Sequence, residues 1–174
     1  MWTRTYNNQR LFIQFQPVDI SGVLTLESEL FPDACRTPES LLPAGMKGFS
    51  RLYTLRAAGR VIGYILGFVT AEDLDLFRIG IKKSHQGKGY GKILLYFFIV
   101  QVQYSDKLEH IFLEVSTHNR AALTLYKHAG FEPMGMRRDY YSPGDDALIL
   151  RLALNKTLPH IVKEHNTWKV VIHG

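Results

Sequence analysis

A glycine-rich turn near the middle of the chain carries the strongest chemical signal in the sequence. Gly87, Gly89 and Gly91 stand at alternate positions between an apolar run typical of a strand and a longer apolar run typical of a helix. Glycine lets a backbone adopt positive φ and approach a ligand closely, and the unpaired N–H groups at a helix start attract anions. The turn therefore predicts a site for a phosphate-bearing ligand, to which Lys88 and Lys92 add positive charge.

The spacing of the turn distinguishes between the phosphate sites that it could form. A Walker A loop needs Gly-x-x-x-x-Gly-Lys-Ser/Thr, but Gln86 stands at the first glycine position and Ile93 follows Lys92. A dinucleotide site needs Gly-x-Gly-x-x-Gly and a downstream acid. Glu114 is near the right distance for that acid. The glycine spacing differs, however, and a hairpin is predicted upstream, so this alternative is weakened and stays open.

The same residues fit a third pattern, and they resemble a known family. Gln86-Gly87-Lys88-Gly89-Tyr90-Gly91 matches Gln/Arg-x-x-Gly-x-Gly/Ala, the acyl-CoA site of the GNAT acetyltransferase superfamily. Two later segments, 113–131 and 136–141 (Met-Arg-Arg-Asp-Tyr-Tyr), resemble the RimI-like branch, whose members acetylate the α-amine of a protein N-terminus. The resemblance covers roughly residues 9–154.

The resemblance implies acetyl-CoA as the cosubstrate and indicates which residues would hold it. The backbone groups of Ile79, Gly80 and Ile81 would pair with pantetheine amides, because family members splay this strand from its neighbour. Gly80 stands where alanine is common, a change that should be harmless to a backbone contact. Asn119 matches the CoA-contacting asparagine of the family, although a helix N-cap explains it nearly as well. The pyrophosphate would lie on the main-chain N–H groups of Gln86, Gly87, Lys88, Gly89, Tyr90, Gly91 and Lys92.

Two side chains match the proton-transfer groups of the family. Glu114 corresponds to the general base that takes a proton from the attacking amine, directly or through water. The alternative is a structural carboxylate paired with a nearby arginine. Tyr126 corresponds to the general acid that protonates the departing thiolate. The alternative is helix packing, because Tyr126 shares an apolar stripe with Ala122 and Leu125, and a tyrosine can serve both roles.

Aromatic residues in two segments match the acceptor site of related Nα-acetyltransferases. Tyr140 and Tyr141, expected in the last hairpin loop, would clamp the first residues of an acceptor peptide. Phe31 and Pro32, in the loop after the first helix, resemble the opposite wall. The resemblance therefore implies that these four residues bind the acceptor.

The predicted reaction is direct transfer of acetyl from acetyl-CoA to the N-terminal α-amine of a protein, of the ribosomal-protein type, in a ternary complex. Two alternatives stay open. One is a GNAT enzyme acting on another amine, such as a lysine, a polyamine, an amino sugar or an antibiotic, since one fold serves many acceptors. The other is a non-catalytic CoA-binding module, against which the presence of both Glu114 and Tyr126 argues.

Apolar periodicity and turn signals predict the elements that position these groups. We expect strands at 11–16, 51–56, 60–69, 75–81, 110–116, 131–138 and 146–154, and helices at 19–30, 39–42, 89–104 and 119–129. This order predicts an α/β fold. The resemblance implies the GNAT arrangement, a mixed and mostly antiparallel sheet with a splayed strand pair and helices on both faces. Residues 1–154 would form one acetyltransferase domain, followed at 155–174 by an extension of unknown role that includes a short strand at 167–172.

Composition argues against several other classes of protein. The 174 residues are 46% hydrophobic and 21% charged, with a net charge of +5, which is ordinary for a globular domain. No run of like charges suggests a nucleic-acid arm, so direct nucleic-acid binding is not expected. The longest apolar run, 93–100, is too short to span a membrane, and the N-terminus has no apolar leader segment.

Cysteine and histidine usage indicates the compartment and argues against a metal. Cys35 is the single cysteine, which excludes an intramolecular disulfide and favours a reducing, cytoplasmic location. The seven histidines lack the spacing of metal ligands, so no metal is expected. No feature of the sequence indicates an oligomeric state.

Overall fold

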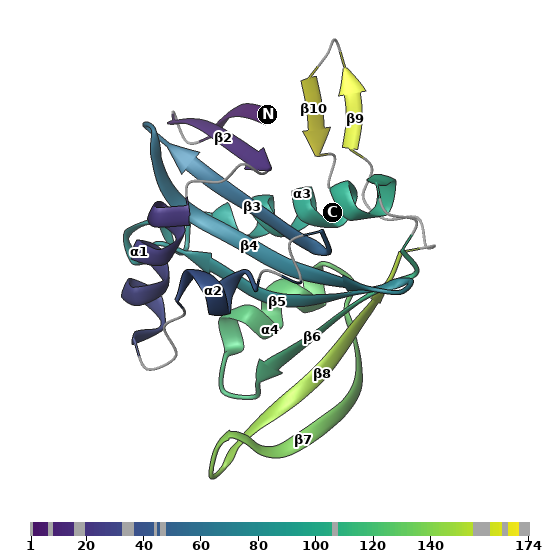
Figure 1. The fold of residues 1–174 in the computed structure, drawn as a ribbon. Helices are drawn as coiled ribbons and strands as arrows, with labels where there is room; N and C mark the ends of the chain where they lie inside the picture. The colour runs from purple at the N-terminus through teal and green to yellow at the C-terminus, as the bar shows by residue number, and fades with distance from the viewer. Residues whose placement is uncertain are drawn as a thin grey trace.

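The computed structural model describes residues 2–6, 9–15, 20–32, 37–43, 45, 48–105, 108–154, 161–164 and 167–170. Its central feature is an eight-stranded sheet with the order β1-β2-β3-β4-β5-β6-β8-β7 (Figure 1). The strands are β1 (Trp2–Tyr6), β2 (Gln9–Phe15), β3 (Ser50–Ala57), β4 (Arg60–Thr70), β5 (Asp73–Ile81), β6 (His110–Ser116), β7 (Glu132–Ser142) and β8 (Asp145–Ala153). Only β5 and β6 are parallel neighbours in this sheet, so the expected mixed, mostly antiparallel sheet is confirmed.

Helices cover both faces of the sheet, as predicted. α1 (Ile20–Leu30) and α2 (Pro38–Leu41) lie on one face, and α3 (Tyr90–Ser105) and α4 (Arg120–His128) lie on the other (Figure 1). The apolar run 93–100 in α3 is buried along its whole length, as expected for a central helix. Each face has its own core. The smaller core consists of Val23, Leu26, Leu41, Leu52, Tyr64 and Leu66, and the larger one gathers around α3 and α4.

The parallel strands β5 and β6 separate soon after they meet. Their pairing is limited to Asp73–Asp75 of β5 with His110–Phe112 of β6. Beyond this point β5 stays paired with β4, and β6 stays paired with β8. The sheet therefore contains the predicted splayed pair, and the facing edges of the two strands diverge toward their C-terminal ends.

A β-bulge in β5 changes which side chains face α1. Gly67 of β4 pairs with Leu76 and Leu66 pairs with Arg78, so Phe77 has no partner in the register. Neighbouring residues of a regular strand point to opposite faces, whereas a bulge can bring two of them to the same side. The Arg78 guanidinium carbon accordingly lies 5.5 Å from the centre of the Phe77 ring. The bulge therefore brings a cation onto the side of the sheet that α1 covers.

The strand that carries the two tyrosines is longer than predicted. Tyr140 and Tyr141 lie within β7, not in a hairpin loop, so that expectation was wrong. The Pro and Gly in Tyr-Tyr-Ser-Pro-Gly-Asp signalled a broad loop, but the turn consists of Pro143 and Gly144 alone, with Gly144 at φ 81°. A glycine in this conformation reverses the chain without the strain of a side chain.

The two ends of the chain add strands to this arrangement. β1 was not predicted, and it pairs with β2 at the edge of the sheet. The strand expected at 167–172 is β10 (Thr167–Val170), which pairs with β9 (Ile161–Glu164) in a separate hairpin. Cys35, the single cysteine, is outside the described residues.

Gly80 lies where α1 packs most closely on the sheet. A Cβ atom added to Gly80 would lie 2.8 Å from Leu30 Cδ1 and 2.9 Å from Tyr64 Cε1. Real Cβ atoms do not approach other atoms this closely, so alanine would force the ring or the helix to move. The position is therefore restricted by packing, in addition to any backbone contact with a ligand.

We predict that Gly80→Ala lowers the free energy of unfolding by about 1–3 kcal/mol, because overpacking a tight contact displaces its neighbours. Urea denaturation followed by circular dichroism measures the change. Gly48→Ala is the matched control, since a Cβ there meets nothing within 4 Å. Equal stability of both variants would show that the contact with Tyr64 does not constrain residue 80.

Candidate active site

The glycine turn has the conformation that an anion site requires. It follows a short 3-10 helix (Lys83–His85), and Gly87 and Gly89 adopt φ of 71° and 82° immediately before α3. Within the described part of the chain, the backbone N–H groups of Gly87, Lys88 and Gly89 donate no hydrogen bond. These donors, together with the positive end of the α3 dipole, fit a bound phosphate group.

Two side chains of the turn stabilise its shape. The Gln86 amide nitrogen donates to the Ile81 carbonyl at 2.8 Å, and Lys88 Nζ donates to the Ser84 carbonyl at 2.8 Å. Tyr90 is buried in the larger core, and the centre of its ring lies 5.9 Å from that of His85 in the preceding 3-10 helix. Lys92 Nζ lies 5.7 Å from the centre of the Tyr96 ring. Gln86 and Lys88 therefore position the backbone donors of the turn.

The other predicted donor-site residues lie on the splayed strand and at the start of α4. Ile79, Gly80 and Ile81 pair with β4 on one edge, and their other edge faces the opening toward β6. Asn119 Oδ1 accepts a hydrogen bond from the Ala122 N–H at 3.1 Å, so the N-cap interpretation is confirmed. Its contact with CoA stays a prediction.

A cavity of about 670 Å³ opens where β5 and β6 diverge. Both predicted tyrosines, Tyr140 and Tyr141, line it, and so does Glu114. The full lining is Asp75, Leu76, Phe77, Arg78, Phe112, Leu113, Glu114, Arg137, Tyr140, Tyr141 and Ile149. Phe31 and Pro32, predicted as the opposite wall, are not among these residues. Phe31 instead packs on Arg78, with the guanidinium carbon 4.4 Å from the ring centre.

Glu114 has the arginine partner that the structural alternative predicted. Arg137 Nε lies 3.1 Å from Glu114 Oε1, and the two side chains are 57% and 28% exposed, so both groups reach solvent. A hydrogen bond to the Glu114 carboxylate, followed by the charge of that carboxylate, raises the pKa of Tyr140. The Arg137 guanidinium carbon lies 5.5 Å from the centre of the Tyr140 ring. Glu114, Arg137 and Tyr140 therefore form one connected group at the cavity wall.

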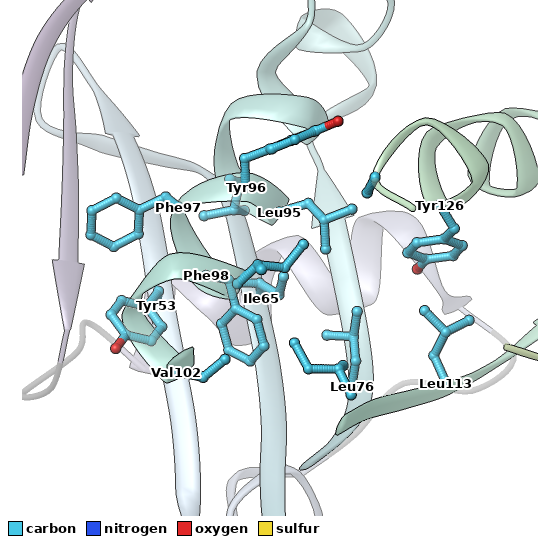
Figure 2. Packing of buried hydrophobic residues seen from close by; sticks show 14 of the residues in the cluster. Tyr53, Ile65, Leu76, Leu95, Tyr96, Phe97, Phe98, Val102, Leu113 and Tyr126 are labelled. Carbon is cyan, nitrogen blue, oxygen red and sulfur yellow. The ribbon is translucent and has the colours of Figure 1, made fainter. Parts of the chain in front are cut away.

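Tyr126 is buried and is not among the residues that line the cavity. Its ring packs against Phe131 with centroids 5.5 Å apart, so the packing role is real. Figure 2 shows the ring at the α4 side of the larger core, which also contains Leu76 and Leu113 of the two splayed strands. Burial, and next the charge of Tyr141, raise the pKa of Tyr126. The phenol therefore keeps its proton at neutral pH and is available as a donor.

Comparison with protein families identifies the fold and the broad activity. The family model described as Acetyltransferase (GNAT) family matches residues 21–131, which include the glycine turn, β6 and α4. The chain belongs to the GNAT acetyltransferase family. Members of this family transfer an acetyl group from acetyl-CoA, so the donor site predicted from the turn agrees with the family.

Individual GNAT relatives match at moderate identity. The N-alpha-acetyltransferase RimI of Mycobacterium tuberculosis is 35% identical over 101 residues, which cover 55% of this chain and 61% of the relative. An uncharacterized protein of Mycobacterium leprae is 28% identical over 159 residues, 84% of this chain but 42% of the relative. The chain thus spans less than two thirds of the length of either relative.

A solved GNAT structure has the same fold. The crystal structure of the ribosomal-protein-S18-alanine N-acetyltransferase of Escherichia coli superposes with a TM-score of 0.74 and 23% identity. The match covers 84% of this chain and 96% of the other. At this identity the similarity establishes the fold alone.

This GNAT chain also contains a buried charged cluster that sequence reasoning missed. Glu27 of α1 is fully buried, and its Oε2 lies 3.0 Å from Arg78 Nη1. The Tyr64 hydroxyl donates to Glu27 Oε1. Burial, and then the hydrogen bond and charge of Glu27, raise the pKa of Tyr64. The cluster therefore connects α1 to the splayed strand and holds Arg78 at the cavity.

A signal for Glu27 was present in the sequence. Glu27 stands four residues after Val23 and three after Leu24, on the apolar face of the predicted helix, where an acid requires a buried partner. Arg78 gave no such signal, because the bulge that orients it depends on the register with β4.

Asp75 was also missed. Burial, and then the charges of Asp73 and Glu114, raise the pKa of its carboxyl group.

Other kinds of site are not seen in the part of the chain that the structure describes. Among those residues, no group of three or more His, Cys, Asp and Glu side chains is arranged to hold a metal ion. No described helix combines the length and the apolar character needed to cross a bilayer.

We predict that Arg78→Met lowers the free energy of unfolding by about 3–5 kcal/mol, because it leaves Glu27 buried without its cation. Lys82→Met is the matched control. Lys82 Nζ lies 3.7 Å from Glu29 Oε2 in a partly exposed pair that joins the residue after β5 to α1, so its removal should cost less than about 1 kcal/mol. Denaturation curves measure both, and similar losses would argue against a special role for the buried pair.

Proposed function

We propose that this chain acetylates the N-terminal α-amine of a protein, by direct transfer from acetyl-CoA in a ternary complex. The observation that carries the proposal is the cavity at the splay, where Glu114, Tyr140 and Tyr141 share one wall. In line with this, the Mycobacterium tuberculosis relative is named an N-alpha-acetyltransferase and the Escherichia coli neighbour a ribosomal-protein-S18-alanine N-acetyltransferase. Residues 1–154 would form the acetyltransferase domain, and 155–174 an extension without an assigned role.

The size and the polar groups of the cavity suit a short extended acceptor. A volume of about 670 Å³ is within the usual range of sites for small molecules, about 300–1,000 Å³. Such a space accommodates the first residues of a peptide better than a folded loop. The lining contains two carboxylates, of Asp75 and Glu114, and two guanidinium groups, of Arg78 and Arg137. An α-ammonium group would therefore find a carboxylate partner in a cavity whose charges are otherwise balanced. The two tyrosines supply apolar area and hydroxyl groups around the acceptor.

The residues of the donor side suit acetyl-CoA, which would supply the activated thioester. Gln86, Gly87, Lys88, Gly89, Tyr90, Gly91 and Lys92 would hold its pyrophosphate, mainly through backbone N–H groups. The open edge of Ile79–Ile81 would pair with its amides, because β6 has already diverged from β5 at this point. Asn119 is occupied in capping α4, so its contact with CoA would use the remaining capacity of its amide.

Glu114 and Tyr126 would perform the two proton transfers. An α-ammonium group with a pKa of about 7.7–8.0 must lose a proton before its nitrogen can attack. Glu114 reaches both the cavity and solvent, so it would accept that proton directly or through one water. Tyr126, kept protonated by burial, would donate to the leaving sulfur. Arg137 would hold the Glu114 carboxylate in place while it acts.

Acceptor choice tests this proposal directly. The protein is incubated with acetyl-CoA and three acceptors: a peptide with a free N-terminal alanine, the same peptide blocked at the N-terminus but carrying a lysine, and spermidine. We expect thiol release with the first acceptor only, and mass spectrometry should locate the acetyl group on the α-amine. Acetylation of the lysine or the polyamine without the α-amine would contradict the proposal. CoA binding without turnover of any amine would favour a binding module.

Substitution of the proton-transfer groups tests their roles. We predict that Glu114→Gln and Tyr126→Phe each lower kcat by about 10²–10⁴-fold, the usual contribution of general acid–base catalysis. The dissociation constant for acetyl-CoA should change less than about twofold. Tyr104→Phe is the control, because Tyr104 is 71% exposed at the end of α3. Equal losses of turnover and CoA affinity in Tyr126→Phe would indicate that Tyr126 only packs.

A further inference from the structure

Tyr140 and Tyr141 are consecutive in β7, yet both line the same cavity. In a regular strand, successive side chains point to opposite faces, so one of these tyrosines would face away from it. The register shows where β7 departs from regularity. Arg137 pairs with Ala147 and the next pair is Ser142 with Asp145, so residues 138–141 stand opposite Asp146 alone.

Asp139 is the residue at which the backbone departs from strand geometry. Among the described residues, the non-glycine residues with positive φ are Ala58, Ala71 and Asp139. Ala58 and Ala71 lie in turns between strands, whereas Asp139, at φ 52°, lies inside β7. Asp and Asn tolerate this left-handed conformation better than other residues with a side chain. An aspartate therefore suits the position.

Two hydrogen bonds fix Asp139 in this conformation. Its backbone N–H donates to Asp146 Oδ1 at 2.9 Å, and its own Oδ1 accepts from the Gly144 N–H at 2.6 Å. One contact reaches the facing strand β8 and the other reaches the turn between β7 and β8. The conformation is therefore held through both the backbone and the carboxylate of Asp139.

The next two residues make the contacts that this geometry permits. The centre of the Tyr140 ring lies 5.5 Å from the guanidinium carbon of Arg137, and Arg137 is paired with Glu114. The Glu114 carboxylate raises the pKa of Tyr140. The Tyr141 ring meets the Tyr140 ring edge to face, with centroids 5.1 Å apart. Both rings therefore line the same cavity as the candidate base Glu114.

We infer that Asp139 is a positioning residue, whose left-handed backbone, held by Asp146 and Gly144, turns both tyrosines toward the acceptor cavity. Asp139 does not line the cavity itself, so it acts through Tyr140 and Tyr141. Its expected effect is on acceptor affinity and not on acetyl-CoA. This inference rests on the proposed function for its kinetic test, but its conformational test is independent of that function.

The kinetic test compares substitutions at residue 139. Asp139→Ala should raise KM for the acceptor peptide roughly tenfold, because a left-handed alanine is strained and the contact with Gly144 is lost. KM for acetyl-CoA should change less than about twofold. Asp139→Asn, which tolerates the conformation and keeps an acceptor oxygen, should stay near the wild type. An unchanged acceptor KM in Asp139→Ala, or an equal rise of both KM values, would overturn the inference.

If Asp139→Ala does not fold, a comparison of Asp139→Gly with Asp139→Asn replaces it. Asp139→Gly adopts the conformation freely but lacks the carboxylate, so its acceptor KM should exceed that of Asp139→Asn several-fold. Equal values for the two would overturn the inference. Met134→Ala is the control on the same strand, because Met134 is 51% exposed and does not line the cavity.

A double-substitution cycle asks whether Asp139 acts through the tyrosines. In a Tyr140→Ala/Tyr141→Ala background, adding Asp139→Ala should leave the acceptor KM unchanged, since the groups that it positions are gone. A further rise as large as the one in the wild type would overturn the inference.

The conformational test follows the ionisation of Tyr140 by the phenolate absorbance. Subtracting the absorbance titration curve of Tyr140→Phe from that of the wild type isolates the titration of Tyr140. The same subtraction is made between Asp139→Ala and the double variant Asp139→Ala/Tyr140→Phe. Loss of the Glu114 contact, which outweighs the opposing charge of Arg137, should move the midpoint to lower pH. An unmoved midpoint would overturn the inference. A moved midpoint in a protein that acetylates no peptide would support the inference and overturn the proposed function instead.

Discussion

The separation of β5 from β6 is the constraint on which the rest of the molecule depends. Their parallel pairing ends at Asp75 and Phe112, so the facing edges beyond these residues cannot satisfy each other. Buried backbone groups need hydrogen-bond partners, and each strand finds them on its outer edge, from β4 or β8. The inner edges beyond these residues therefore pair with no other strand of the sheet. The glycine turn, the candidate base and the tyrosines all lie around this opening because their elements begin or end there.

Two arginine–glutamate pairs beside the opening differ in their surroundings, and so in what they can do. Glu27 is fully buried against Arg78 and Tyr64, where an acceptor cannot reach it. Glu114 is 28% exposed beside Arg137 and lines the cavity. The first pair fixes α1 on the sheet, and the second leaves a carboxylate available for chemistry. The same residue types thus form a buried structural pair in one case and a partly exposed pair that contains the candidate base in the other.

Features set by local pattern were predictable from the sequence, and features set by strand register were not. The apolar run of α3, the alternation in β6 and the N-cap at Asn119 depend on neighbouring residues, and the predicted elements match them. The bulge that orients Arg78 and the distortion at Asp139 arise between strands. No local pattern encodes them. Roles for Glu114 and Tyr126 came from family resemblance, because burial and partners appear only in the folded chain.

The missing side chain at Gly80 has a consequence for the charges around the cavity between β5 and β6. A methyl group there would compete for space with the Tyr64 ring, and the Tyr64 hydroxyl is a partner of Glu27. Glu27 in turn holds Arg78 at the cavity. The side-chain volumes at residues 64 and 80 therefore depend on each other, and through Tyr64 they are coupled to the charged pair of Glu27 and Arg78. A chain with alanine at 80 would need a smaller residue than tyrosine at 64, and a different means of balancing the acid and the base.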